Sequence, residues 1–126
     1  MIGSNTKESH PVIANRMIMA HKKGARIIVA DPRRVEMARF AEVYLNLRPG
    51  TDIALLNAIA HVIIKEGLYN KEFISSYTEG FEEWSTTIDT YTPEFAEGIT
   101  GVDRQLIIKS ARIYGNSRRA GIFYTM

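Results

Sequence analysis

The chain has 126 residues, 45% of them hydrophobic and 24% charged, which is the composition of one ordinary folded domain and excludes extensive disorder. The 16 Lys and Arg residues against 14 Asp and Glu residues give a formal net charge of +2, which is too balanced to predict nucleic-acid binding. The sequence contains no cysteine, so disulfides, thiolate metal sites, a cysteine nucleophile and an iron–sulfur cluster held by this chain's own thiolates are excluded.

The apolar runs of the sequence are far shorter than a membrane span, and the first residues do not form a signal-peptide pattern. We therefore expect no membrane insertion and a cytoplasmic location, which the absence of cysteine also favours. Basic pairs occur at Lys22–Lys23, Arg33–Arg34 and Arg118–Arg119, and we interpret them mainly as solvated surface.

The first predicted elements are the end of a strand and a helix, joined by a polar loop. Met1-Ile2 leads into the small and polar residues 3–10. Pro11 suits the first turn of a helix, because its missing N–H costs nothing there. Two cations and a glycine, Lys22-Lys23-Gly24, then predict the end of that helix.

Two short strands with a short helix between them are predicted next. Residues 25–30 are rich in β-branched side chains and indicate a buried parallel strand. A short helix is expected over 35–41, and a second strand over 43–47, which Arg48-Pro49-Gly50 closes. A strand, a helix and a strand with tight connections are typical of a βαβ unit with a parallel sheet.

Helices dominate the second half of the sequence. Thr51 or Asp52 opens a long amphipathic helix that Gly67 ends. Thr100 to Asp103 is similar to a capping box with Asp in the place of Glu, and it opens a helix to about Tyr114. A final strand is predicted over 120–124. The helices expected between residues 70 and 98 carry aromatic side chains that we interpret as core: Phe73, Tyr77, Phe81, Trp84, Tyr91 and Phe95.

The order of these elements predicts a single α/β domain over residues 1–126. We expect a Rossmann-like three-layer architecture with a mostly parallel sheet, and an additional helical segment inserted at about residues 70–100. Both ends of the sequence lie against expected strands, which favours a segment of a longer protein. Open sheet edges favour association, so self-association is a further expectation.

Three loops that follow predicted strands carry the candidate binding residues. The first, Gly3-Ser4-Asn5-Thr6, leads from a strand end to a helix, where backbone N–H groups and the helix dipole attract an anion. The full G-x-G-x-x-G pattern is absent, so an ordinary turn is an equal alternative. Asp31 stands where doubly wound folds bind a ribose diol, although Asp-Pro also commonly starts turns.

The third loop spans residues 48–52 and again joins a strand to a helix. Because the carboxyl ends of parallel strands meet at one sheet edge, we expect the three loops to converge there on a ligand. A metal site made by this chain alone is not expected, since His10, His21 and His61 are far apart and lack carboxylates at ligand spacing. No catalytic residue is predicted.

The same loops resemble a known family. GSNTKESHP, IIVADPRR and LRPGTDIALLNAIAHVIIKEGLYNKEFI, followed by EGFEEW and TPEFAEGITGV, are similar in order and spacing to the catalytic alpha subunit of molybdopterin-dependent formate dehydrogenases. The resemblance covers essentially the whole chain. It implies a bis-molybdopterin guanine dinucleotide cofactor with molybdenum or tungsten in the complete enzyme, and a Rossmann-like domain that holds one of the two dinucleotides.

The resemblance also implies, position by position, which residues contact the cofactor. The first loop matches the strip along the pyrophosphate, with the contacts Gly3, Ser4, Asn5, Thr6 and Glu8. Asp31, Pro32 and Arg33 match the turn near the guanosine. Asp52 matches the residue that reads the guanine edge, in a contact made by Gly50, Thr51 and Asp52. Met126 belongs to the start of a loop that touches the pterin side.

Family members also need groups that this sequence does not contain. They carry a cysteine or selenocysteine that ligates the metal, a neighbouring histidine, and a distant arginine for the substrate. We therefore expect an internal segment that binds the cofactor together with the rest of the catalytic subunit or other subunits, and that is not autonomous in catalysis. A nitrate or sulfoxide reductase-type molybdoenzyme is an alternative, and a non-catalytic nucleotide-binding or association module is another.

Overall fold

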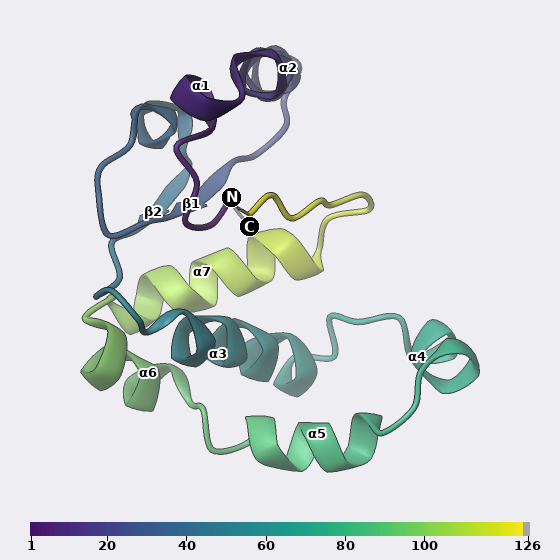
Figure 1. Cartoon of the computed structure of the whole chain (residues 1–126). Coiled ribbons are helices and arrows are strands. Elements are labelled where there is room, and N and C mark those ends of the chain that lie inside the picture. Colours follow the sequence, from purple (N-terminus) through teal and green to yellow (C-terminus); the bar gives the residue numbers. More distant parts are fainter. Residues whose placement is uncertain (125–126) are drawn as a thin grey trace.

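The computed structural model describes residues 1–124, which form mostly helices around a small parallel sheet (Figure 1). In chain order the elements are α1 (Thr6–Ser9), α2 (Pro11–Lys22), β1 (Ile28–Ala30), the 3₁₀ helix η1 (Glu36–Phe40), β2 (Val43–Leu45), α3 (Asp52–Lys65), α4 (Lys71–Tyr77), α5 (Phe81–Ile88), α6 (Pro93–Thr100) and α7 (Arg104–Gly115). Within the described residues, no helix is long and apolar enough to cross a membrane.

The sheet confirms the expected parallel pairing, but in a shorter form than the sequence predicts. β1 and β2 pair in parallel, with Ile28 opposite Val43. The predicted strands at the two ends of the sequence are reduced to single bridges, in which Ile2 pairs in parallel with both Ala30 and Tyr124. Four segments therefore lie side by side in the order 122–124, 1–2, β1, β2. The Rossmann-like three-layer arrangement stays a prediction.

The strands lie between two groups of helices, which Figure 1 shows above and below the sheet. Val29 of β1 packs on one side in a cluster with Ala14 of α2 and Met37 of η1. Val43 and Leu45 of β2 face the other side and pack in a cluster with Leu55 of α3 and with residues of α6 and α7. This alternation follows the two-residue period of a strand. Because helices cover both faces of the sheet, the sequence of each strand is a continuous apolar run.

The predicted helices between residues 70 and 100 are present, but the prediction that their aromatic side chains form a core is wrong. Phe73, Tyr77, Trp84 and Phe95 are between 45% and 77% exposed. No residue of α4 is buried, and Ile88 is the one buried residue in α5. Helices of seven and eight residues turn only one small face to the rest of the chain, so most rings lie against each other on the surface.

The predicted capping box at residues 100–103 is also wrong. Thr100 is the last residue of α6, and its Oγ1 donates to the carbonyl of Ala96 and accepts from the N–H of Val102. Gly101 takes a left-handed conformation with φ of 74°, which ends α6. Asp103 is the true N-cap of α7, since its carboxylate accepts a 2.6 Å hydrogen bond from the N–H of Gln105.

Candidate functional site

The first candidate loop turns sharply at the carboxyl end of the Met1-Ile2 segment. Gly3 has a φ of 54°, and its N–H donates to the carbonyl of Ala30 at 2.9 Å. The helix expected from Pro11 is present as α2, and the additional single turn of α1 precedes it within the loop. The backbone hydrogen bond to Ala30 fixes the loop beside the end of β1.

Polar side chains of this first loop are buried, which is unusual for an ordinary surface turn. The hydroxyl oxygens of Ser4 and Thr6 lie 2.8 Å apart in a hydrogen bond, and Thr6 also donates to the sulfur of Met1. The Oδ1 atom of Asn5 is buried and has no hydrogen-bond partner among residues 1–124. A buried acceptor without a donor costs about 1–3 kcal/mol, so the loop is suited to a ligand that supplies a hydrogen-bond donor.

Asp31 follows β1 and is buried, with 3% of its surface exposed. Its backbone N–H donates to the carbonyl of Leu45, and its Oδ1 accepts from the N–H of Arg33 at 2.8 Å. The carboxylate thus forms the turn that the Asp-Pro sequence favours, which is the simpler of the two interpretations given to it above. Pro32 and Arg33 are exposed beside it and are free to face a ligand.

Tyr44 is a residue of this region that the sequence argument missed. Its hydroxyl donates to the backbone carbonyl of Asp31 at 3.0 Å and lies 3.3 Å from Oδ1 of Asn46. Burial raises the pKa of the Tyr44 hydroxyl, and the negative charge of Asp31 raises it further, so the group stays a neutral donor. The period-two pattern of β2 could have placed Tyr44 on the face opposite Val43 and Leu45, but it gives no sign of the hydrogen bond.

The third loop is shaped by Gly50, whose φ is 79°, and by Thr51, whose hydroxyl donates to the carbonyl of Arg48 at 2.6 Å. Asp52 is the first residue of α3 and is half-buried. Its carboxylate makes no hydrogen bond or ion pair within residues 1–124. The Arg48 guanidinium donates to the carbonyls of Gly98 and Ile99, so this arginine holds the loop to α6.

The structure joins the first two loops directly, and it links the second loop to β2, the strand that the third loop follows. The Gly3–Ala30 hydrogen bond and an ion pair between Lys7 and Glu36 join the first loop to the region that follows β1. Among the described residues no hydrogen bond joins residues 48–52 to either of the other loops. Glu8 lies exposed on α1. Met126, the last candidate from the sequence, lies outside the described residues.

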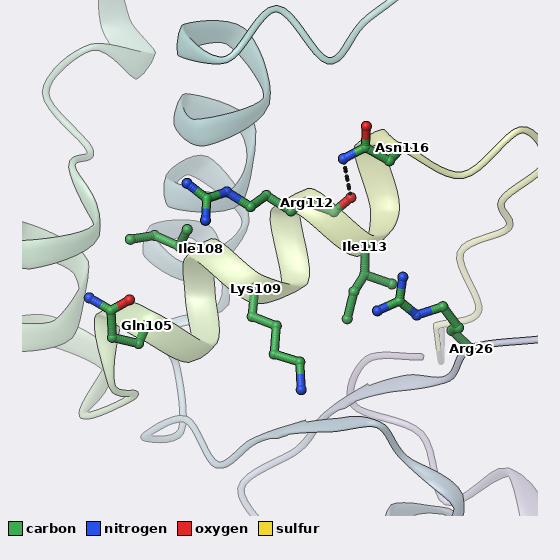
Figure 2. Close-up of a pocket in the computed structure, with 7 residues that line it drawn as sticks. All are labelled: Arg26, Gln105, Ile108, Lys109, Arg112, Ile113 and Asn116. Atoms are coloured by element: carbon green, nitrogen blue, oxygen red, sulfur yellow. Dashed lines mark hydrogen bonds between the residues drawn. The ribbon is translucent and has the colours of Figure 1, made fainter.

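A groove of about 450 Å³ lies along α7, and Figure 2 shows the residues that line it. Its cations are already paired: Arg26 binds both carboxylate oxygens of Glu42 at 2.6 Å, and Arg112 binds Glu66. In Figure 2 the side chains of Lys109 and Arg112 leave α7 in different directions. This groove therefore does not gather charge on one point, and within the described residues no cluster suits a metal ion.

Comparisons with known proteins give a consistent result. The sequence pattern of the molybdopterin oxidoreductase family matches residues 1–96. The formate dehydrogenase subunit alpha of Methanocaldococcus jannaschii is 56% identical over the whole chain, and a nitrate reductase of Symbiobacterium thermophilum is 43% identical over 91% of it. The solved structure of acetylene hydratase from Pelobacter acetylenicus superposes over 98% of the chain with a TM-score of 0.92 and 38% identity.

The chain spans only part of each of these proteins. It covers 19% of the M. jannaschii protein, 17% of the nitrate reductase and 17% of the acetylene hydratase chain. The three proteins carry names for three different reactions, and the backbone of this chain is nearly the same as that of the matched part of the acetylene hydratase. Similarity over this segment therefore does not distinguish the three named reactions.

Proposed function

This chain belongs to the molybdopterin oxidoreductase family, and from that membership we propose that it is the segment of a formate dehydrogenase-type catalytic subunit that binds the guanine dinucleotide of a molybdopterin cofactor. The observation that favours formate chemistry over nitrate chemistry is the identity of 56% with a formate dehydrogenase subunit against 43% with a nitrate reductase. Formate oxidation to carbon dioxide would belong to the complete enzyme.

The first two loops fit the sugar and phosphate part of such a ligand. Buried hydroxyls of Ser4 and Thr6, the free acceptor of Asn5 and the turn at Asp31 lie together at the carboxyl end of parallel segments. That edge is where open α/β sheets bind nucleotides. We propose that a ribose hydroxyl donates to Asn5, and that the exposed guanidinium of Arg33 contacts phosphate.

Asp52 is suited to select the base. Its half-buried carboxylate has no partner within residues 1–124, and it stands in the first turn of α3. The two carboxylate oxygens match the two neighbouring N–H donors on the Watson–Crick edge of guanine, whereas adenine does not offer that pair. In this proposal Gly50 and Thr51 shape the loop so that the carboxylate of Asp52 faces the base.

The order of the sheet segments supports a Rossmann-like arrangement in the complete subunit. Numbered by position in the chain, the four segments lie in the order 4-1-2-3, which is the order of the first four strands in the 3-2-1-4-5-6 sheet of dinucleotide-binding domains. The order in which strands are added to the sheet changes direction between residues 1–2 and residues 122–124. Open α/β sheets bind ligands at such a switch point. We propose that further strands of the subunit extend this sheet into three full layers.

These positions suggest different roles for this chain and for the rest of the catalytic subunit. The metal and pterin group, with molybdenum or tungsten, would supply the redox chemistry when bound. This chain's residues would hold and orient the nucleotide end of the cofactor, and the rest of the catalytic subunit would supply the metal ligand and the substrate-binding groups. A cytoplasmic location stays a prediction.

A titration of the ¹⁵N-labelled chain with GDP tests the proposal, with ADP as the matched control ligand. We expect amide shifts at Asn5, Asp31 and Asp52 with GDP. The substitution Asp52→Asn should weaken GDP about tenfold and leave ADP unchanged, because a charged hydrogen-bonding pair is lost only with guanine. Asp89→Asn, at an exposed ion pair with Lys65, is the control variant. An absence of shifts at all three residues with saturating GDP would contradict the proposal.

A nitrate reductase-type enzyme is the second candidate, supported by the 43% identical relative. The two candidates share the nucleotide site and differ in the metal ligand and the substrate groups. The coding sequence on both sides of this segment distinguishes them, and so do assays of the complete subunit with formate and with nitrate. Turnover of nitrate without formate would overturn the formate assignment and leave the nucleotide site intact.

A further inference from the structure

The surface of α4 and α5 combines exposed rings with acidic side chains. Two groups of rings lie there, Phe73 against Tyr77, and Phe81 between Tyr69 and Trp84, with centroids 5.1–6.0 Å apart. The acidic side chains around them are exposed: Glu72, Glu79, Glu82 and Glu83. We call these nine residues the aromatic–acidic surface. A groove of about 590 Å³ opens between the two helices and is lined by Phe81, Glu82 and Glu83 among others.

Most of this surface is not covered by the rest of the chain. α4 has seven residues, none of them buried, and within residues 1–124 no other helix or strand packs closely against it. A helix of that length is marginal in water without tertiary contacts. Exposed aromatic groups of this kind, surrounded by polar residues, are typical of a docking site.

The outer face of α2 has the opposite character. Val12, Arg16, Met19 and Lys23 are exposed and follow one another at spacings of four, three and four residues, so they form one stripe along the helix. The inner face, which includes Ala14, packs on the sheet. We call these four exposed residues the basic stripe. With Lys22 beside it, the stripe contains apolar side chains and cations but no acidic residue.

The two surfaces are complementary in charge. Residues 11–23 contain three cations and no Asp or Glu, whereas residues 69–88 contain four Glu and one Lys. Arg16, Lys22, Lys23 and the four glutamates take part in no ion pair within residues 1–124. Figure 1 shows α2 and the α4–α5 pair at opposite ends of the molecule, with the sheet, α7 and α3 between them, so they cannot meet within one chain.

We propose that the basic stripe of one chain docks on the aromatic–acidic surface of a second copy of this chain. Met19 and Val12 would lie on the exposed rings, and Arg16 and Lys23 would pair with Glu82 and Glu83. The two contacting surfaces differ, so the contact is head-to-tail and each added copy leaves one surface of each kind free. Association is then open-ended. It differs from the association through sheet edges that the sequence suggested, because no strand takes part.

The first test is sedimentation equilibrium of the cofactor-free chain over a wide concentration range. We expect the average mass to rise with concentration without a plateau at the dimer, and to fall in high salt, where the Debye length shrinks from about 10 Å at 0.1 M to about 3 Å at 1 M. Trp84 is the one tryptophan of the sequence, so its emission should shift to the blue over the same range. A mass and an emission maximum that do not change with concentration would overturn the proposal.

The second test exchanges the charges. Glu82→Lys with Glu83→Lys makes both surfaces basic, and Arg16→Glu with Lys23→Glu makes α2 acidic. All four side chains are exposed, and circular dichroism checks that each variant folds. Each double variant alone should associate at least about tenfold more weakly, because like charges now face each other. An equimolar mixture should associate again, since one variant offers an intact basic stripe and the other an intact aromatic–acidic surface.

The matched control is Arg118→Glu with Arg119→Glu, which changes the net charge by the same amount as the α2 variant but at exposed residues outside both surfaces. It should associate like the unmodified chain. If it weakens association as much as the α2 variant does, the effect is one of net charge and the proposed contact is wrong. If the mixture of the two double variants stays dissociated, the pairing of these two surfaces is wrong. Neither result involves nucleotide, so both are independent of the GDP titration.

Discussion

The region around the sheet and the α4–α5 region contain similar side chains and use them in opposite ways. Between the sheet, α3 and α7, apolar residues such as Leu45, Leu55 and Ile107 have no exposed surface. In α4 and α5, larger apolar residues remain exposed although they occur at helical spacing. The difference shows that burial depends on whether several elements converge on a residue, and not on how hydrophobic the residue is.

The largest difference in stability between the two regions should come from shortening a side chain in the core. Ile107→Ala removes a fully buried side chain packed among α7, α3 and β2, and it should lower the free energy of unfolding by about 2–5 kcal/mol. Phe73→Ala removes a larger side chain from α4 and should cost less than about 1 kcal/mol, because the ring is 54% exposed. Urea unfolding at low protein concentration measures both. Equal losses of unfolding free energy in the two variants would contradict the contrast between the two regions.

The next largest change in stability is expected for a substitution at Gly115. A Cβ at this position would lie 2.7 Å from the Cβ of Leu68, so Gly115→Ala should destabilise the fold by about 1–3 kcal/mol through overpacking where α7 passes the end of α3. Gly98 in α6 has open space around it. Gly98→Ala should therefore stabilise by up to about 1 kcal/mol through helix propensity. Thermal unfolding of both variants checks the opposite signs.

A smaller effect distinguishes the caps of the two regions. Asp103 caps α7 and Asn70 caps α4, each by accepting a backbone hydrogen bond. Asp103→Ala should lower the global free energy of unfolding by about 1 kcal/mol, and Asp103→Asn should restore most of it. Asn70→Ala should leave the global value unchanged and increase amide exchange in α4 alone. A global loss from Asn70→Ala would show that α4 is coupled to the core.

The smallest effect is the pH dependence of one exposed ion pair. The hydrogen bonds from Arg112 lower the pKa of Glu66 below its ordinary value. A carboxyl whose pKa is lower in the folded state contributes stability above its unfolded pKa, and this contribution is lost as the pH falls through the folded pKa. Glu66→Gln should therefore flatten the acid side of the stability profile slightly. An unchanged profile would show that the pair contributes nothing.

Local signals in the sequence account for the parts of the fold that were predicted correctly. Pro11 and Gly24 bound the first long helix, and the β-branched run before Asp31 is a parallel strand. The aromatic core was predicted wrongly, because a periodic pattern shows that residues share a face and does not show what covers that face. The Thr100 cap was wrong for a related reason: Gly101 ends one helix, and Asp103 opens the next, within four residues.

Some features of the candidate site could likewise be predicted from the sequence, and others could not. The pattern of strand ends correctly placed the first loop beside Asp31, since Gly3 and Ala30 are joined by a hydrogen bond. The contacts that hold the third loop could not be predicted. They are hydrogen bonds from Arg48 to carbonyls of α6, about fifty residues away in sequence, which no local pattern encodes. The roles of Asn5 and Asp52 in binding a nucleotide stay predictions.

The bridge between Ile2 and Tyr124 has a consequence for the order of folding. It joins two segments that are more than a hundred residues apart in the chain and that run in the same direction. Closing so long a loop costs entropy before the contact returns any stability. We therefore expect this pairing to form late, after the helices between the two segments have packed.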